Sequence, residues 1–255
     1  DGNFYLYPLD KSFDADGKDL NATPNGSFYT FTSRLGLDVT GPDIGKARSS
    51  AKIETDFGGF SGSNTMLRIR QAYVNLDWGK SAVLVGITWH PLFGAVMPDV
   101  LNLSTGAPFQ PFNRSPQIRY QYKANSRVQL TASVLWQLQY LSSGPKGMSE
   151  DYIKNSCIPE MFVGADFTPA DGWLMGLGAH MISLKPRTST EWKEQTFKVN
   201  ERMTAFSYEA HLKYSGRNYT FAAKTLMASA LDHTALLGGY GVSSVDSRTG
   251  EQGYT

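Results

Sequence analysis

The connections between the predicted strands alternate between short and long along the chain. Short ones, rich in turn-forming residues, lie at 41–45, 79–80, 124–126, 169–172 and 215–218. Longer ones lie at about 9–27, 58–65, 91–116, 142–159, 185–202 and from 229 onward. Tight turns at one rim and long loops at the other are typical of a transmembrane antiparallel meander. A soluble sandwich has no reason to keep this alternation through five successive hairpins.

The segments between these connections alternate apolar and polar residues with a period of two, as a sheet with two different faces requires. The clearest run extends from Arg127 to Tyr140, with Leu135 as its one exception. With a partial strand at 3–8, we count about eleven strands, the others being 28–40, 48–57, 66–78, 81–90, 117–123, 160–168, 173–184, 203–214 and 219–228. The predicted fold is all-β: an antiparallel transmembrane β-barrel.

Composition excludes several other classes. The net charge of +1 lacks the basic excess of a nucleic-acid binder, and a single cysteine excludes a disulfide framework. No stretch reaches the roughly 20 consecutive apolar residues of a transmembrane helix.

Several aromatic residues flank turns or loops, where amphipathic rings gather at a bilayer interface: Trp78, Trp89, Trp173, Tyr214 and Tyr219.

Five segments in order resemble the DcaP-like outer-membrane porins: 33–37, 41–42, 52–57, 67–74 and 84–89, which read SRLGL, GP, KIETDF, LRIRQAYV and LVGITW. This resemblance covers about residues 28–90. It implies a homotrimer in the outer membrane of a Gram-negative bacterium, a barrel of roughly sixteen strands and a positively charged constriction that favours small anions. We expect residues 1–255 to be one barrel domain, incomplete at both ends, because the early strands and a terminal aromatic strand are absent.

If the apolar side of each strand faces lipid, the alternate polar residues line the lumen. In the strand at 66–78 the polar face shifts phase between Arg70 and Gln71, which predicts a β-bulge that keeps both halves polar-inward. The predicted pore-lining residues are Arg34, Lys52, Glu54, Asp56, Arg68, Arg70, Arg119 and Arg127, with Asp38, Gln121, Lys123, Glu209, His211 and Lys213 on the same face.

The basic residues among these have two interpretations. Adjacent strands bring Arg34, Lys52, Arg68 and Arg70 together, and a ring of cations favours anionic solutes. Glu54 and Asp56 lie beside them, however, so the arginines could instead form a purely structural ladder of ion pairs within the wall.

The connection at 91–116 is too long and too apolar to extend freely into water, so we expect it to fold against another part of the protein. It could enter the barrel and narrow it, with Asp99 and Arg114 as its charged tips. It could equally pack on a neighbouring subunit.

Signals for catalysis or metal binding are weak. The segment 59–63, GFSGS, resembles a nucleophile elbow only loosely, and 14–19, DADGKD, lacks the downstream Glu of a calcium loop. The four histidines, at 90, 180, 211 and 233, fall on different strands or loops without paired spacing. We therefore expect no enzyme activity, no metal site and no cofactor.

The function predicted from these features is passive diffusion of small hydrophilic, anionic solutes through an outer-membrane porin. Its expected partners are the lipid bilayer, the solutes and two further copies in a homotrimer, with no nucleic acid. The alternative is a plugged barrel whose loops form an interaction scaffold for a partner protein or a surface glycan.

Overall fold

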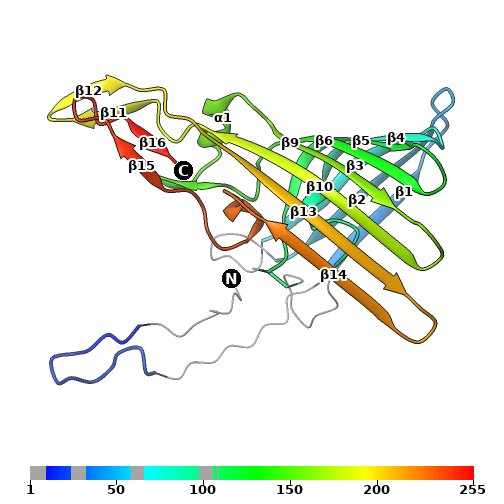
Figure 1. Cartoon of the computed structure of the whole chain (residues 1–255), viewed down its shortest axis with the longest axis horizontal. Helices are drawn as coiled ribbons and strands as arrows, with labels where there is room; N and C mark the ends of the chain where they lie inside the picture. Colours follow the sequence, from blue (N-terminus) through cyan, green and yellow to red (C-terminus); the bar gives the residue numbers. More distant parts are fainter. Residues whose placement is uncertain (1–9, 24–32, 59–65, 98–105, 108) are drawn as a thin grey trace.

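The computed structural model describes residues 10–23, 33–58, 66–97, 106–107 and 109–255. Ten strands form a single antiparallel sheet in which each strand pairs with the next strand of the sheet along the chain (Figure 1). They are β1 (Arg34–Thr40), β2 (Arg48–Asp56), β3 (Arg68–Asp77), β4 (Ser81–Trp89), β5 (Arg114–Lys123), β6 (Val128–Leu135), β9 (Glu160–Phe167), β10 (Trp173–Leu184), β13 (Met203–Ser215) and β14 (Thr220–Met227).

Ten of the eleven predicted strands are therefore confirmed, and the predicted strand at 3–8 lies outside the described residues. Two boundaries differ from the predictions. β5 begins at Arg114 because its pairing with β4 continues as far as Trp89. β6 ends at Leu135, where the alternation breaks, and not at Tyr140.

The short turns and the long connections lie at opposite ends of the sheet, as the sequence predicts (Figure 1). The long connections contain small elements that the sequence did not predict: η1 (Pro91–Phe93), η2 (Asp232–Thr234), α1 (Asp151–Ser156) and three hairpins, β7 (Ser143–Gly144) with β8 (Gly147–Met148), β11 (Ser189–Trp192) with β12 (Gln195–Lys198), and β15 (Val242–Val245) with β16 (Gln252–Tyr254). Among the described residues, no helix is long and apolar enough to cross a membrane.

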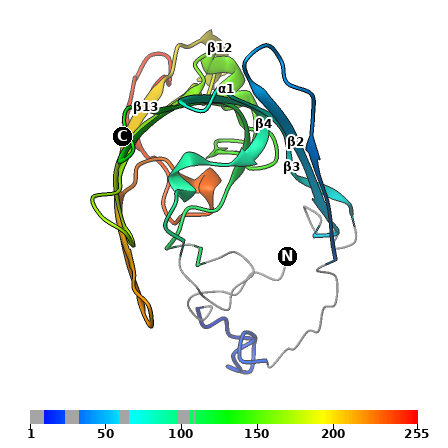
Figure 2. The ribbon, with the colours of Figure 1, turned by 90° about the vertical axis from the view of Figure 1, so that its right-hand side faces the viewer.

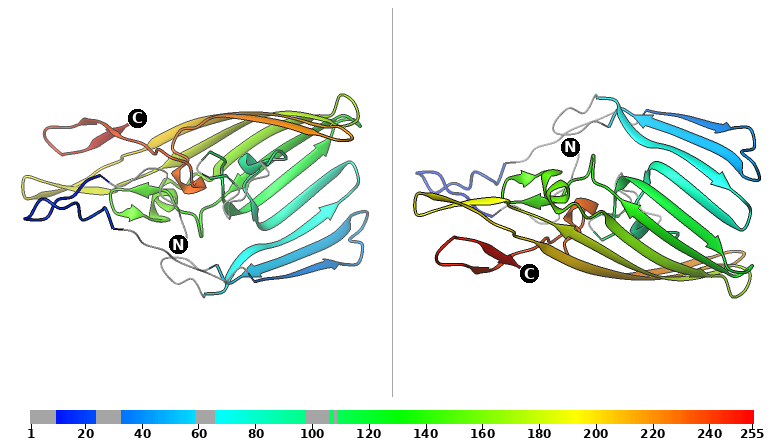
Figure 3. Two further views of the ribbon diagram at one scale, coloured as in Figure 1. Left: turned by 90° about the horizontal axis from the view of Figure 1, so that it is seen from below. Right: turned by 90° about the horizontal axis from the view of Figure 1, so that it is seen from above.

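The sheet is strongly curved, and Figure 2 shows it end-on as an arc whose hollow side contains η2 and the segment that follows β4. Here we call the inner side of this arc the concave face. β1 and β14 form the two edges of the sheet, and neither pairs with a further strand among the described residues (Figure 3).

In this sheet the exposed face is apolar and the buried face is polar, the reverse of a sheet in a soluble protein. In β13, Phe206 is 54% exposed on the convex side, whereas the neighbouring Ser207 is 0% exposed on the concave side. Other apolar residues are exposed in the same way on every strand of the sheet, among them Leu37, Ile53, Val74, Val85, Ile118, Leu130, Val163, Leu177 and Phe221. Apolar side chains directed outward and polar side chains directed inward are the arrangement of a wall between lipid and water.

Candidate functional site

A β-bulge in β3 brings two arginines onto the concave face. Glu54 pairs with Gln71, but Thr55 pairs with Ile69, so Arg70 is an extra residue without a partner in the register. Since a bulge shifts the alternation of one strand by one residue, Arg68, Arg70 and Gln71 can all point to the same side. The bulge predicted from the phase shift in the sequence is confirmed.

The bulge places these arginines against two carboxylates of β2. Arg70 Nε lies 2.6 Å from Glu54 Oε1 and its Nη1 lies 2.8 Å from Asp56 Oδ2. Arg68 Nε lies 2.5 Å from Asp56 Oδ1. Three of these four side chains are nearly buried, with side-chain exposures of 8% for Arg70, 13% for Glu54 and 9% for Asp56. The pairs are therefore mostly desolvated. Arg68 and Arg70 therefore pair with the carboxylates of the wall, as the second interpretation of these cations expected.

Three of the four remaining predicted pore-lining cations differ in the partners they have. Lys52 Nζ is paired with Asp38 Oδ1 at 2.9 Å, whereas Arg34, with 54% of its side chain exposed, lies 3.9 Å from Glu54. Arg119 makes no ion pair within the described part of the chain: its Nη2 donates to the carbonyl of Trp89 at 2.6 Å and its Nε donates to Gln117 Oε1 at 3.0 Å.

Arg127 lies at the rim of the wall, one residue before β6, where its carbonyl accepts a hydrogen bond from Thr168 N at 2.8 Å. It is an exposed residue of the short turn before β6, where the Asn125 side chain accepts hydrogen bonds from the backbone N–H groups of Arg127 and Val128. This Asx turn ends one residue later than the sequence interpretation assumed. The prediction that Arg127 projects from a strand is wrong, and its position is at the short-turn rim.

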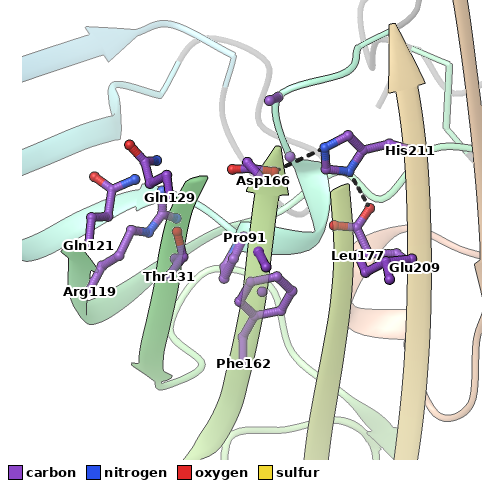
Figure 4. A pocket seen from close by; sticks show the side chains of 14 residues that line it. Pro91, Arg119, Gln121, Gln129, Thr131, Phe162, Asp166, Leu177, Glu209 and His211 are labelled. Carbon is purple, nitrogen blue, oxygen red and sulfur yellow. Dashed lines mark hydrogen bonds and ion pairs between the residues drawn. The ribbon is translucent and has the colours of Figure 1, made fainter. Parts of the chain in front are cut away.

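A hollow of about 220 Å³ lies on the concave face between β5, β6, β9, β10 and β13 and the segment after β4. Figure 4 shows Arg119, Gln121 and Thr131 on one side of it, with Asp166, Glu209 and His211 on the other. His211 Nε2 lies 3.1 Å from Asp166 Oδ1, and its Nδ1 lies 3.4 Å from Glu209 Oε2. One side thus carries a cation without an ion pair and the other carries two carboxylates around an imidazole.

Phe162 lies at the floor of this hollow, over two glycines that face one another in adjacent strands. Gly164 of β9 pairs with Gly178 of β10. A Cβ atom would lie 2.8 Å from the Phe162 ring if added at Gly164, and 2.7 Å from it if added at Gly178. The absence of side chains at these positions therefore allows the ring to lie flat along the wall.

The described part of the connection between β4 and β5 packs on the concave face. Lys224 of β14 donates from its Nζ to the carbonyl oxygens of Leu92 and Phe93, at 2.5 and 3.0 Å. The other end of the connection binds η2, because Phe112 N donates to the Thr234 carbonyl at 2.6 Å and Asn113 Nδ2 to the His233 carbonyl at 3.0 Å. Two long connections are thus joined to one another inside the arc.

Arg114 is not a charged tip of this connection, so that prediction is wrong. It is the first residue of β5 and is 1% exposed. Its guanidinium lies over the rings of Trp89 and Phe112, at 4.9 and 5.3 Å, and its Nη2 donates to the Tyr140 hydroxyl at 2.7 Å. The reason is that aromatic rings solvate a guanidinium by cation–π contacts, so the strand can begin with a buried charge. Asp99, the other predicted tip, lies outside the described residues.

The aromatic residues near the strand ends differ between the two rims. At the short-turn rim, Trp173, Tyr214 and Tyr219 form a continuous group, with ring centroids 4.8 and 5.7 Å apart. Trp89, at the other rim, stacks on Phe93 at 4.1 Å. Trp89 therefore takes part in internal packing, while the first group has the position of an interfacial belt.

The interpretation of the histidines as scattered is wrong, because three of the four surround one buried carboxylate. The Nε2 atoms of His90, His180 and His233 lie 3.4, 3.3 and 3.1 Å from Glu160 Oε2. We call these four residues the histidine cluster. No signal in the sequence indicates it, since its members come from β9, β10 and two separate long connections.

The chain is similar in structure to known outer-membrane proteins. No protein-family model matches the chain, and no curated protein matches it either. Among solved structures, the outer membrane channel DcaP of Acinetobacter baumannii matches with a TM-score of 0.69 and 22% identity over 92% of this chain and 62% of that one. A loop-deletion mutant of OmpT, an outer membrane protein of Vibrio cholerae, matches with a TM-score of 0.48 and 14% identity over 77% of this chain and 61% of that one.

The match to DcaP confirms the predicted fold, that of an outer-membrane β-barrel, over nearly the whole chain. It also agrees with the resemblance found in the sequence and with the predicted location. The chain spans less than two thirds of the length of DcaP.

Proposed function

We propose that this chain forms the larger part of the wall of a passive channel in the outer membrane of a Gram-negative bacterium. The observation that carries this proposal is the inverted distribution of its side chains. Apolar residues are exposed on the convex face of all ten strands of the sheet, and polar residues are buried on the concave face. Such a sheet is stable only between lipid and a polar interior.

The open edges of the sheet support a larger barrel. Unpaired backbone groups at β1 and β14 would each cost several kcal/mol in hydrocarbon, so these edges must pair with further strands in a membrane. In this proposal residues 1–255 belong to a single barrel domain of roughly sixteen strands, which assembles as a homotrimer, as the resemblance to DcaP-like porins implies. In this proposal the channel carries solutes without changing them.

The solutes that fit this channel best are small hydrophilic anions. Arg34 is the most exposed cation near the carboxylates of Glu54 and Asp56: 54% of its side chain is exposed, and it lies 3.9 Å from Glu54, which already pairs with Arg70 at 2.6 Å. Arg119 adds a cation that borders the hollow. A carboxylate or phosphate group near these cations recovers part of the stabilisation that it loses with its hydration shell.

Reconstitution of the full-length protein into planar lipid bilayers tests this proposal. We expect ohmic conductance, and under a salt gradient a reversal potential with the sign of anion preference. A folded protein without conductance would instead support the alternative, a plugged barrel that serves as an interaction scaffold. The two long connections that occupy the concave side give that alternative its structural basis.

A cation-selective conductance would retain the channel and reject the anionic solutes. Conductance and selectivity therefore test the two parts of the proposal separately.

A further inference from the structure

The histidine cluster joins four segments that are far apart in the sequence. Glu160 begins β9, His180 lies within β10, His90 follows β4, and His233 belongs to η2. All four side chains are at most 1% exposed. The chain has only four histidines, so three of them meeting at one carboxylate oxygen requires a physical reason.

Both oxygens of Glu160 take part in this group. Its Oε2 faces the three rings, and its Oε1 accepts a hydrogen bond from Gln137 Nε2 at 2.8 Å. A neutral imidazole and a carboxylate are both common ligands of divalent transition metals.

Three of the donor atoms lie close enough together to share one metal ion. One ligand atom each from His90, Glu160 and His233 lie within 4.8 Å of one another. Ligand atoms at about 2.05 Å from a tetrahedral zinc ion lie roughly 3.3 Å from one another, so a small inward movement of the rings would bring these three into coordination. His180 borders this group, with its Nε2 atom 3.3 Å from Glu160 Oε2.

The far sides of two of the three rings leave their tautomers free to change. When Nε2 binds a metal, the ring proton must be on Nδ1. The Nδ1 atoms of His180 and His233 are buried and have no hydrogen-bond partner in the described part of the chain, so no existing bond opposes this tautomer. His90 Nδ1 accepts a hydrogen bond from Leu92 N at 3.2 Å, which coordination by His90 would replace.

We propose that His90, Glu160 and His233 form a binding site for a divalent transition-metal ion, with zinc as the best fit and with His180 beside it. The side chains of these ligands are at most 1% exposed, so no substrate can reach the ion. The role of the ion is therefore structural. It ties the connections that contain η1 and η2 to β9, and so holds both against the concave face (Figure 2).

Metal titration of the full-length protein, purified without a histidine tag and stripped with a chelator, tests this site. We expect one zinc ion per chain by calorimetry, the intense visible absorption of tetrahedral cobalt on substitution with Co²⁺, and a higher unfolding temperature when zinc is present. His233→Gln and Glu160→Gln should each lower zinc affinity by roughly 100-fold or more, since each removes a ligand.

His211→Gln is the matched control, because His211 is also buried and lies beside two carboxylates but belongs to a different group. It should retain zinc affinity and the cobalt spectrum. His233 lies in η2, outside the sheet, so its variant should keep the ten-stranded wall, which the heat-dependent gel mobility of folded barrels will verify.

Absence of binding by the folded wild type would overturn the proposal, as would unchanged zinc affinity in folded His233→Gln. Loss of binding in His211→Gln alone would place the ion elsewhere and would overturn it as well. If Glu160→Gln does not fold, His233→Gln alone decides. If the folded wild type does not bind zinc, the histidine cluster is a hydrogen-bond network in which three N–H groups donate to Glu160.

Discussion

At the scale of single residues, Arg119 borders the hollow and has no carboxylate partner within the described residues. At a few ångströms and an effective dielectric near 20, a cation attracts a monovalent anion by about a few kcal/mol before screening. We predict that Arg119→Gln lowers the anion-to-cation permeability ratio by roughly three- to tenfold, measured from reversal potentials. Arg217→Gln, in the exposed turn before β14, should leave the ratio unchanged. An equal fall in both variants would contradict a specific role for Arg119.

In the ladder of Arg70, Glu54 and Asp56, removal of the arginine should affect stability, and removal of a carboxylate charge should affect ion selectivity. Arg70→Leu leaves two mostly buried carboxylates without their shared partner, which should cost about 3–5 kcal/mol of unfolding free energy in lipid vesicles. Arg48→Gln, which breaks the exposed pair with Asp77 on the same hairpin, should cost about 0–1 kcal/mol. Glu54→Gln should raise anion preference, because it releases positive charge from Arg70 and Arg34. Equal stability losses for Arg70→Leu and Arg48→Gln would show that the ladder is solvated.

At the scale of elements, the facing glycines of β9 and β10 control the position of Phe162. A Cβ at Gly178 would lie 2.7 Å from the Phe162 ring and 2.9 Å from Glu209 Cγ, so Gly178→Ala must push the ring into the hollow. We predict a loss of about 1–3 kcal/mol of unfolding free energy and a smaller single-channel conductance. Gly36→Ala is the matched control within β1, since its nearest atom would lie 3.8 Å away. A normal conductance in Gly178→Ala would mean that Phe162 does not border the permeation path.

Docking of the terminal hairpin, β15 with β16, depends on Glu201. Burial disfavours the charged form of Glu201, but hydrogen bonds from Arg187, Tyr254 OH and Gln252 N outweigh this and hold the pKa of its carboxyl below the usual range. A lowered carboxyl pKa stabilises the folded state above the ordinary value of about 4.3, and this stabilisation is lost as pH falls through the lowered value. We therefore predict that acid loosens the hairpin, measured as faster amide hydrogen exchange at 242–254 after correction for intrinsic rates.

Glu201→Gln should produce the same loosening at pH 7, and Glu191→Gln, an exposed residue of β11, should not. Exchange that is slow in Glu201→Gln at pH 7 would assign hairpin docking to other contacts, such as the hydrogen bond from Trp192 Nε1 to the Ser247 carbonyl.

At the scale of the whole molecule, membrane insertion can be tested with residues that are already exposed. Val163, at the centre of β9, is 58% exposed, and Val242, in the hairpin beyond the sheet, is 51% exposed. Arginine at a lipid-facing position near the midplane costs about 2–4 kcal/mol. Val163→Arg should therefore lower the unfolding free energy in lipid by that amount, whereas Val242→Arg should stay within about 0.5 kcal/mol of wild type. Similar small effects in both would mean that the convex face lies in water.

The sequence by itself determined the wall of this protein, because neighbouring residues carry that information. Alternation with a period of two depends only on consecutive positions, so it located ten strands, their meander order and the bulge at Arg70. The same pattern placed Arg68, Arg70 and Arg119 on the concave face. It failed at Arg114, where a strand begins three residues earlier than predicted, and at Arg127, where a turn ends one residue later than predicted.

The tertiary structure alone decided which side chains meet across the concave face. Pairing of Arg68 and Arg70 with carboxylates depends on the register between β2 and β3, and the pairing of Lys224 with the Leu92 carbonyl depends on the curvature that brings β14 toward η1. The histidine cluster joins positions 90, 160, 180 and 233, whose spacing follows no period of a strand or helix. Contacts of this kind arise only when long connections fold back into the arc, and no local pattern in a sequence records that event.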